Sequence, residues 1–150
     1  IDGSDNLPTR YLVNDACVRL GIPNVHGAVF RFEGHVTVFW PGKEGSDGPC
    51  YRCLFPELSN QDAPSCAQAG VLGVLPGVIG LLQAVECIKI LLGIGRPLIG
   101  RLLYYEALDA SFHELKLKGN PNCRCCGKNA NFEGYKNYQQ VCATQGDVSE

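Results

Sequence analysis

Two short cysteine motifs constrain the fold of this chain more strongly than any other feature of its sequence. Cys50 and Cys53 form one C-x-x-C pair, and a second cluster contains Cys123 and Cys126. Four thiolates in two such turns can surround Zn²⁺ tetrahedrally, because each turn points both sulfur atoms inward. Residues 54–122 separate the motifs, so a shared metal would hold two distant loops together. Such a closed four-sulfur site is structural rather than catalytic.

A third cysteine in the second cluster, Cys125, leaves the choice of ligand open. We favour Cys126, because its two-residue gap from Cys123 matches the first pair and because Gly127 permits a tight backbone after the turn. Two local disulfides or a redox-active C-x-x-C motif are the alternatives to zinc.

The composition is compatible with one globular domain in a reducing compartment. The chain has 150 residues, 45% of them hydrophobic, and nine cysteines, an odd number that fits metal binding better than a disulfide framework. We therefore expect a cytoplasmic protein. Because 13 Lys plus Arg oppose 15 Asp plus Glu, no global basic field exists to hold nucleic acid. A rival hypothesis, a zinc-stabilised binding module, depends on a local basic patch formed by Lys116, Lys118, Arg124 and Lys128.

A long apolar stretch, residues 69–93, predicts a buried central helix that begins near Pro76. Gln83, Glu86 and Lys89 interrupt it, so it falls short of the roughly 20 apolar residues that cross a bilayer, and we expect no membrane span. Small residues at Gly73, Gly77 and Gly80 leave a track that another element could approach closely. We therefore expect this helix to lie at a subunit interface.

The remaining elements are predicted from periodicity and turn residues. Residues 7–20 predict a helix closed by Gly21. Two β-rich runs, 24–32 and 35–40, predict a hairpin that turns at Glu33 and Gly34, and residues 101–108 and 112–118 predict a second antiparallel pair. The polar tail from residue 128 has the composition of a linker.

The amino-terminal residues predict the end of a strand, a turn at Gly3 and Ser4, and a helix start at Pro8. Because the chain begins with Ile1 rather than Met, we expect it to be a fragment of a larger fold. From the residues alone, Asp5 reads best as the cap of the first helix.

The other reactive side chains carry weaker signals. Cys66 precedes the central helix, where a helix dipole can favour a thiolate nucleophile, although from the residues alone an incidental loop cysteine fits better. Cys17 and Cys87 lie on apolar helical faces and are expected in the core. The three histidines, His26, His35 and His113, have no partner histidine at a metal-ligand spacing and are interpreted as packing or surface residues.

Several motifs in fixed order carry a family resemblance. They are "DGSDNLPTRYLVNDACV", "FEGHVTVFW", "GPCYRCLFP", "SCAQAGVLGVLPGVIGLLQAVECIKILLG" and "LLYYEALDASFHELKLKGNPNCRCCG". Together they resemble the second half of the MoeB/ThiF adenylyltransferases, relatives of ubiquitin-activating enzymes, over residues 2–127. The resemblance implies an α/β fold: the carboxyl-terminal half of a Rossmann-like adenylation domain, with a mixed sheet, a buried central helix and a Cys₄ zinc site.

The resemblance also implies an activity and its partners. Members of this family use ATP and Mg²⁺ to adenylate the C-terminal glycine of a ubiquitin-like sulfur carrier protein ending in Gly-Gly, and they act as homodimers. Which carrier is used is left open, and with it the pathway: molybdenum cofactor, thiamin or tRNA thiolation. A binding or dimerisation module without catalysis is the alternative, because the family's glycine-rich nucleotide loop belongs to its first half, which these residues do not include.

Residue by residue, the resemblance places nucleotide contacts at Asp5 and Asn6 and zinc ligands at Cys50, Cys53, Cys123 and Cys126. Cys66 matches a loop cysteine that only some relatives use as a nucleophile. Glu106 stands where relatives often have Asp. Residues 1–127 are thus expected to form half of an adenylation domain, and residues 128–150 resemble the connector of relatives that carry a rhodanese-like sulfurtransferase domain.

Overall fold

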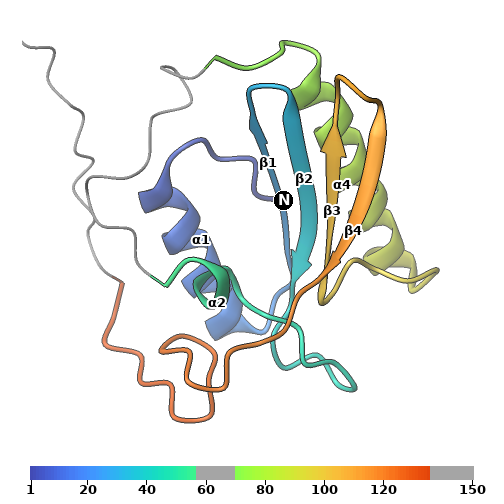
Figure 1. The fold of residues 1–150 in the computed structure, drawn as a ribbon. Helices are drawn as coiled ribbons and strands as arrows, with labels where there is room; N and C mark the ends of the chain where they lie inside the picture. The colour runs from blue at the N-terminus through green and yellow to red at the C-terminus, as the bar shows by residue number, and fades with distance from the viewer. Residues whose placement is uncertain (57–69, 136–150) are drawn as a thin grey trace, which may run out of the picture.

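The computed structural model describes residues 1–56 and 70–135, which form a four-stranded sheet with helices against both faces (Figure 1). Two hairpins build the sheet, as the sequence predicts. The elements in chain order are α1 (Leu7–Leu20), β1 (Asn24–Phe30), β2 (Glu33–Phe39), α2 (Tyr51–Leu54), α4 (Leu75–Leu92), β3 (Arg101–Glu106) and β4 (Ser111–Lys116).

The sheet is antiparallel rather than mixed in the part of the chain that is described. Its strand order is β1-β2-β3-β4, and all three neighbouring pairs run in opposite directions. Short hairpin loops join β1 to β2 and β3 to β4 and permit only this direction, whereas residues 40–100 connect β2 to β3 and would allow either direction. Parallel pairing is confined to isolated bridges, one of which joins Asp2 to His26 and so places the first residues along the free edge of β1.

The first hairpin turns two residues earlier than the sequence predicts. Strand β1 ends at Phe30 and β2 begins at Glu33, with Arg31 in the left-handed region at φ 51°. Backbone bonds hold Arg31 in this conformation, since its N–H donates to Gly70 and its carbonyl accepts from Leu72. Gly34 belongs to β2, where a Cβ atom would lie 2.5 Å from Cδ1 of Ile79. The glycine there serves close packing rather than a turn.

One face of the sheet packs against α4. A core of Val25, Val36, Val38, Ile79 and Leu98 fills the space between them. The helix begins at Leu75, as predicted, and ends at Gly93, whose φ of 64° forms a left-handed cap.

Only one side of α4 is buried in the described chain, although the sequence predicts a buried helix. Its inward side carries Ile79, Gln83 and Glu86, whereas its outward side exposes large apolar side chains. By length and composition alone this helix could cross a membrane, with a mean hydropathy of 1.8. The polar residues on its inward side instead bind the sheet.

Gln83 and Glu86 interrupt the apolar stretch 69–93 because their side chains bind backbone groups of the sheet and its neighbouring segments. Gln83 Nε2 donates to the carbonyls of Asp2 (2.8 Å) and Val25 (3.1 Å), and Gly27 leaves room for it. Glu86 Oε2 accepts the backbone N–H of Leu98 at 2.8 Å. Glu86 thus pairs a backbone N–H that would otherwise be buried without a partner, whereas Gln83 adds a second hydrogen bond to carbonyls that already accept one from the backbone.

The opposite face of the sheet packs against α1 and α2. Phe39 points to this side because successive strand residues alternate between faces, and it meets Tyr11 of α1 and Tyr51 of α2. Helix α1 ends at Gly21, in the left-handed region at φ 66°, which confirms the predicted cap. This layer positions the two candidate sites described next.

Candidate functional site

The four predicted cysteine ligands meet in space. The Sγ atoms of Cys50, Cys53, Cys123 and Cys126 all lie within 4.8 Å of one another. The separations are 3.9 Å for Cys50 and Cys53, 3.7 Å for Cys50 and Cys123, and 3.4 Å for Cys53 and Cys126. Sulfur atoms at the corners of a tetrahedron with Zn–S bonds of about 2.3 Å stand about 3.8 Å apart. The donor set and its dimensions therefore fit a tetrahedral metal.

Both loops are shaped by tight backbone turns. Cys50 occupies the cap position of α2, and the N–H of Cys53 donates to its carbonyl at 3.0 Å. In the second loop the N–H of Gly127 donates to the carbonyl of Cys123 at 2.8 Å. A Cβ atom at Gly127 would lie 2.5 Å from that oxygen, so only glycine fits. Every cysteine in the described ranges is a free thiol, so neither local disulfide of the alternative interpretation is present there.

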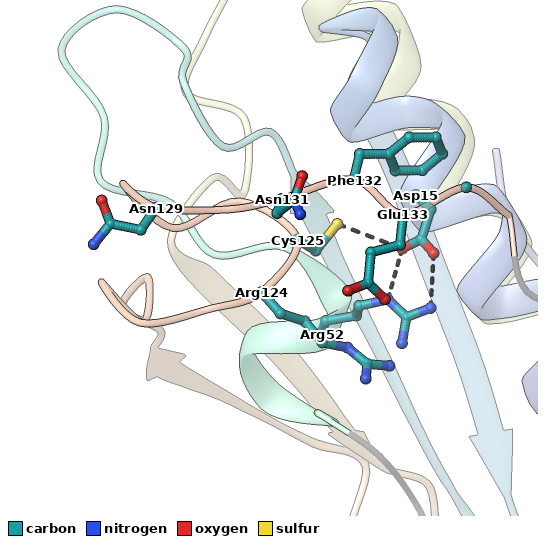
Figure 2. A pocket seen from close by; sticks show the side chains of 9 residues that line it. Asp15, Arg52, Arg124, Cys125, Asn129, Asn131, Phe132 and Glu133 are labelled. Atoms are coloured by element: carbon teal, nitrogen blue, oxygen red, sulfur yellow. Dashed lines mark hydrogen bonds and ion pairs between the residues drawn. The ribbon is translucent and has the colours of Figure 1, made fainter.

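The Cys125 side chain points toward Asp15 of α1, as Figure 2 shows. Its Sγ lies 3.4 Å from Oδ1 of Asp15 and 3.5 Å from Nδ2 of Asn14. The four Sγ atoms that lie within 4.8 Å of one another include that of Cys126 and not that of Cys125, although the Cys125 thiol also contacts that of Cys50.

Asp15 also anchors α2 to α1 through a bidentate ion pair. Arg52 Nε and Nη2 donate to its two oxygens at 2.6 and 2.7 Å, and the guanidinium stacks 4.4 Å from the ring centre of Tyr11. Burial alone would raise the pKa of Asp15, but hydrogen bonds from Arg52 and Asn14 and the Arg52 charge outweigh it and hold the pKa below its ordinary value. Asp15 is therefore an ionised acceptor at neutral pH.

A shallow hollow of about 320 Å³ lies beside this ion pair (Figure 2). The second cysteine loop and the segment after it form its outer wall, and Arg19 of α1 stacks on Phe132 of that segment at 4.5 Å. The lining residues are Asp15, Arg52, Arg124, Cys125, Asn129, Asn131, Phe132, Glu133 and Gly134.

The predicted nucleotide contacts lie at the start of α1. Asn6, not Asp5, caps this helix: its Oδ1 accepts the backbone N–H of Thr9 at 2.9 Å. The capping interpretation of Asp5 is therefore wrong. The Asp5 carboxylate is exposed, and its contact with Asn6 Nδ2 spans 3.4 Å. An exposed carboxylate at this position is free to bind a cation, which is what a Mg²⁺-assisted nucleotide contact requires.

A buried polar cluster adjoins this edge. Asp2 and His26 form an ion pair at 3.2 Å, and the ring of His35 lies 5.7 Å from that of His26. Burial favours a raised pKa for Asp2, but hydrogen bonds from His26 and Ser4 prevail and lower the pKa well below 3.8. Burial, together with the neighbouring His26 and Arg10, lowers the pKa of His35 to about 4. His35 is thus neutral at physiological pH.

The remaining predicted residues are dispersed. Cys66 falls outside the described residues, so its role stays a prediction. Cys17 is half-buried on α1, and Cys87 packs against the core between α4 and the sheet, in agreement with a packing role. His113 is exposed on β4 and contacts Ser111 at 3.1 Å.

Comparison with known proteins decides the family. The model of the ThiF family matches residues 1–125, most of the chain. The chain belongs to the ThiF family. Over 144 residues this ThiF-family chain is 54% identical to a sulfur carrier protein adenylyltransferase of Thermus thermophilus, covering 95% of the chain and 53% of that relative.

Other relatives of the ThiF-family chain come from archaea and plants. A SAMP-activating enzyme E1 of Haloferax volcanii is 53% identical over 85% of the chain and 46% of its own length. An adenylyltransferase and sulfurtransferase MOCS3-1 of Zea mays is 45% identical over 100% of the chain and 32% of its own length. The chain thus spans about half or less of the length of these relatives.

Solved structures share the ThiF-family fold at low identity. The crystal structure of Escherichia coli MccB aligns with a TM-score of 0.66 at 18% identity, over 91% of this chain and 40% of that one. A complex of MccB with AMPCPP and a selenomethionine form of MccA aligns with a TM-score of 0.65 at 19% identity, over 84% and 38%. This likeness supports the α/β arrangement of sheet and helices.

Sequence reasoning missed Asn14 and Asp15, the polar residues of α1 that bind the two cysteine loops. Asn14 and Asp15 follow each other inside a helix that is otherwise apolar on its inward side, and both are buried. Buried neighbours of this kind need partners, which is a signal that the sequence does contain. The partner of Asp15, Arg52, lies inside the first cysteine motif, whose spacing predicts metal ligands and says nothing about the residues between them.

Proposed function

We propose that this chain is part of an adenylyltransferase that uses ATP to activate the C-terminal glycine of a ubiquitin-like sulfur carrier protein. In that reaction a carboxylate oxygen of the carrier attacks the α-phosphorus, the bond to the β-phosphate oxygen breaks, and pyrophosphate leaves. The acyl adenylate that forms can then accept sulfur. The names of the relatives from Thermus and Haloferax support this assignment, and so does the match of residues 1–125 to the family.

The observation that carries the proposal is the exposed carboxylate of Asp5 at the start of α1. The preceding residues are fixed along β1, because Asp2 N–H donates to Val25 and Asp2 O accepts from Gly27. The Asn6 cap orients the first turn of the helix. Asp5 would hold Mg²⁺, an ion that offsets phosphate charge when bound. The remaining contacts to the triphosphate would come from outside these residues.

The four clustered thiols would bind Zn²⁺ as a structural ion that holds α2 to the second cysteine loop. A closed set of four sulfur ligands leaves no position for substrate, so this metal takes no part in the chemistry. We expect about one zinc per chain and loss of folded structure when a strong chelator removes it.

We also propose a homodimer in which the outward side of α4 forms the interface. Leu81, Val85, Ile88 and Leu92 recur every three or four residues and are 51–72% exposed. The neighbouring glycines 73, 77 and 80 would meet nothing within 4 Å if they carried a Cβ atom, so a second copy could approach closely. A chain that only dimerises, without catalysis, is the second candidate function that this surface favours.

Carrier-dependent exchange of pyrophosphate into ATP tests the proposed activity. The complete gene product should catalyse this exchange with a carrier that ends in Gly-Gly. Asp5→Ala should reduce the rate at least 100-fold, because one charge partner of the triphosphate is lost. Glu44→Ala, which removes an exposed carboxylate in a distant loop, is the matched control and should retain the parent rate.

Two results would count against the proposal. Absence of exchange by the complete protein would leave dimerisation as the better function. Full exchange by Asp5→Ala, with zinc content and circular dichroism unchanged, would remove Asp5 from the nucleotide site.

A further inference from the structure

Helix α1 binds the first cysteine loop through two adjacent side chains. Asn14 Oδ1 accepts the backbone N–H of Tyr51, the residue that follows Cys50, at 2.7 Å. Cys50 makes no side-chain hydrogen bond that would cap α2, so Asn14 provides a cap from another helix. Asp15 holds the next residue, Arg52, by the bidentate pair. Helix α1 thus holds both residues that lie between the two cysteines of the first loop, Tyr51 and Arg52.

The same two side chains also bind the second cysteine loop. Asn14 Nδ2 donates to Cys125 Sγ at 3.5 Å, and the Cys125 thiol donates to Asp15 Oδ1 at 3.4 Å. Cys125 lies between Cys123 and Cys126, whose sulfur atoms point to the cluster instead. Its side chain therefore attaches the second loop to α1 while its neighbours face the metal position.

The attachment is buried and internally connected. Asn14 is 1% exposed and Asp15 9%, and Asn14 Nδ2 also donates to Asp15 Oδ1 at 3.1 Å. Water cannot readily replace the bonds of the deeply buried Asn14, whose loss would leave polar atoms without partners, whereas the contacts of Cys125 are part-buried beside the hollow. Because residues 54–122 separate the loops in the sequence, local chain geometry alone does not bring them together.

We propose that Asn14 and Asp15 are positioning residues of the metal centre, and that Cys125 is the anchor of the second loop rather than a ligand. By holding both loops, they gather the four sulfur atoms before the metal arrives. Less of the binding free energy is then spent on ordering the loops, which raises metal affinity. Outer-sphere partners of metal ligands commonly change affinity by about 10- to 100-fold. The inference rests on the metal centre proposed above.

Competition with a chelator of known zinc affinity tests this inference on the purified chain. Asn14→Ala and Cys125→Ala should each weaken zinc binding by about 10- to 100-fold. Cys125→Ser keeps a hydrogen-bonding group and should restore most of the affinity. Cys17→Ala removes a half-buried thiol of α1 that is not one of the four clustered thiols, and it should bind zinc as the parent does.

Two further measurements separate positioning from ligation and from general stability. The Co²⁺-substituted parent, Asn14→Ala and Cys125→Ala should share one four-thiolate absorption spectrum, whereas Cys126→Ser should alter it. Thermal unfolding with and without zinc should show a smaller metal-dependent increase in stability for Asn14→Ala and Cys125→Ala. A variant that only folds less stably would have a lower unfolding temperature both with and without zinc, and the increase that zinc produces would be unchanged.

The outcomes distinguish this inference from the metal centre itself. Failure of the parent to bind zinc or Co²⁺ would overturn both. Parent-like affinity in both Asn14→Ala and Cys125→Ala would overturn the positioning role alone. A changed thiolate spectrum in Cys125→Ala would make Cys125 a ligand and contradict its assignment as an anchor.

Discussion

At the scale of single residues, the face of the sheet beneath α1 holds ionisable side chains whose pKa values are shifted from their ordinary range. His35 lies beside the hydrogen-bonded side chains of Asp2 and His26, and its pKa falls to about 4 because burial, with the nearby His26 and Arg10, disfavours the charged form of its ring. The unfolded chain binds a proton at His35 near pH 6.5, whereas the folded chain does not. Folding therefore becomes less favourable as the pH falls through this interval.

The pH dependence of unfolding should reveal His35. The parent should lose stability relative to His35→Gln as the pH falls from about 6.5 to about 4, by about 3 kcal/mol in total. Urea denaturation at several pH values measures this difference. His113→Gln, which removes an exposed histidine from β4, should follow the parent. Parallel curves for His35→Gln and the parent would show that His35 is protonated alike in both states.

The cysteine pattern predicted which four thiols lie together, but it did not predict the side chains that hold the two cysteine loops. Spacing identifies Cys50, Cys53, Cys123 and Cys126 because a two-residue gap directs two thiols to one side of a turn. The contacts of Asn14 and Asp15 with these loops span long sequence separations, which no local pattern encodes. The cap alternative for Asp5 failed for a local reason: the adjacent Asn6 accepts the backbone N–H of Thr9 and caps the helix in its place.

At the scale of elements, close packing between α4 and the sheet depends on glycines in the strands. Gly27 admits Gln83 and Gly34 admits Ile79, and a Cβ atom at either position would lie 2.5 Å from the helix side chain. The sequence predicted α4, both hairpins and α1, since their periodicity and caps are local. The predicted position of the first turn was wrong because glycine is common in turns. Gly34 is instead a strand residue, and it is a glycine because Ile79 of α4 packs closely against it.

Substitution of Gly34 tests this packing. Gly34→Ala should destabilise the chain by about 1 to 3 kcal/mol, because the added methyl group overlaps Ile79. Gly34→Ala should cost less in an Ile79→Ala background than in the parent, since both colliding atoms, Cδ1 and Cγ1, are then absent. Gly3→Ala, where a Cβ atom meets nothing within 4 Å, should remain within about 0.5 kcal/mol of the parent. Equal denaturation midpoints for Gly34→Ala and the parent would contradict the close contact.

At the scale of the whole molecule, the two faces of the sheet pack against different groups of helices. One side joins α1, α2 and the cysteine loops, so the candidate nucleotide edge and the metal centre share one helix (Figure 1). The other side carries α4, which contacts β1 and β2 but leaves its own outward side exposed. The sequence indicated an apolar helix but could not divide it into two sides, because apolar residues surround most of its circumference.

That outward side makes oligomerisation the test at this scale. The parent should sediment as a dimer at micromolar concentration, and Leu81→Lys should raise the dimer dissociation constant at least 100-fold, because a buried charge in an apolar interface has no partner. Leu108→Lys alters an equally exposed leucine, at 71%, beyond the end of β3 and should leave the dimer intact. A parent that sediments as a monomer, or a Leu81→Lys variant that dimerises as the parent does, would assign the exposed side of α4 to a different partner.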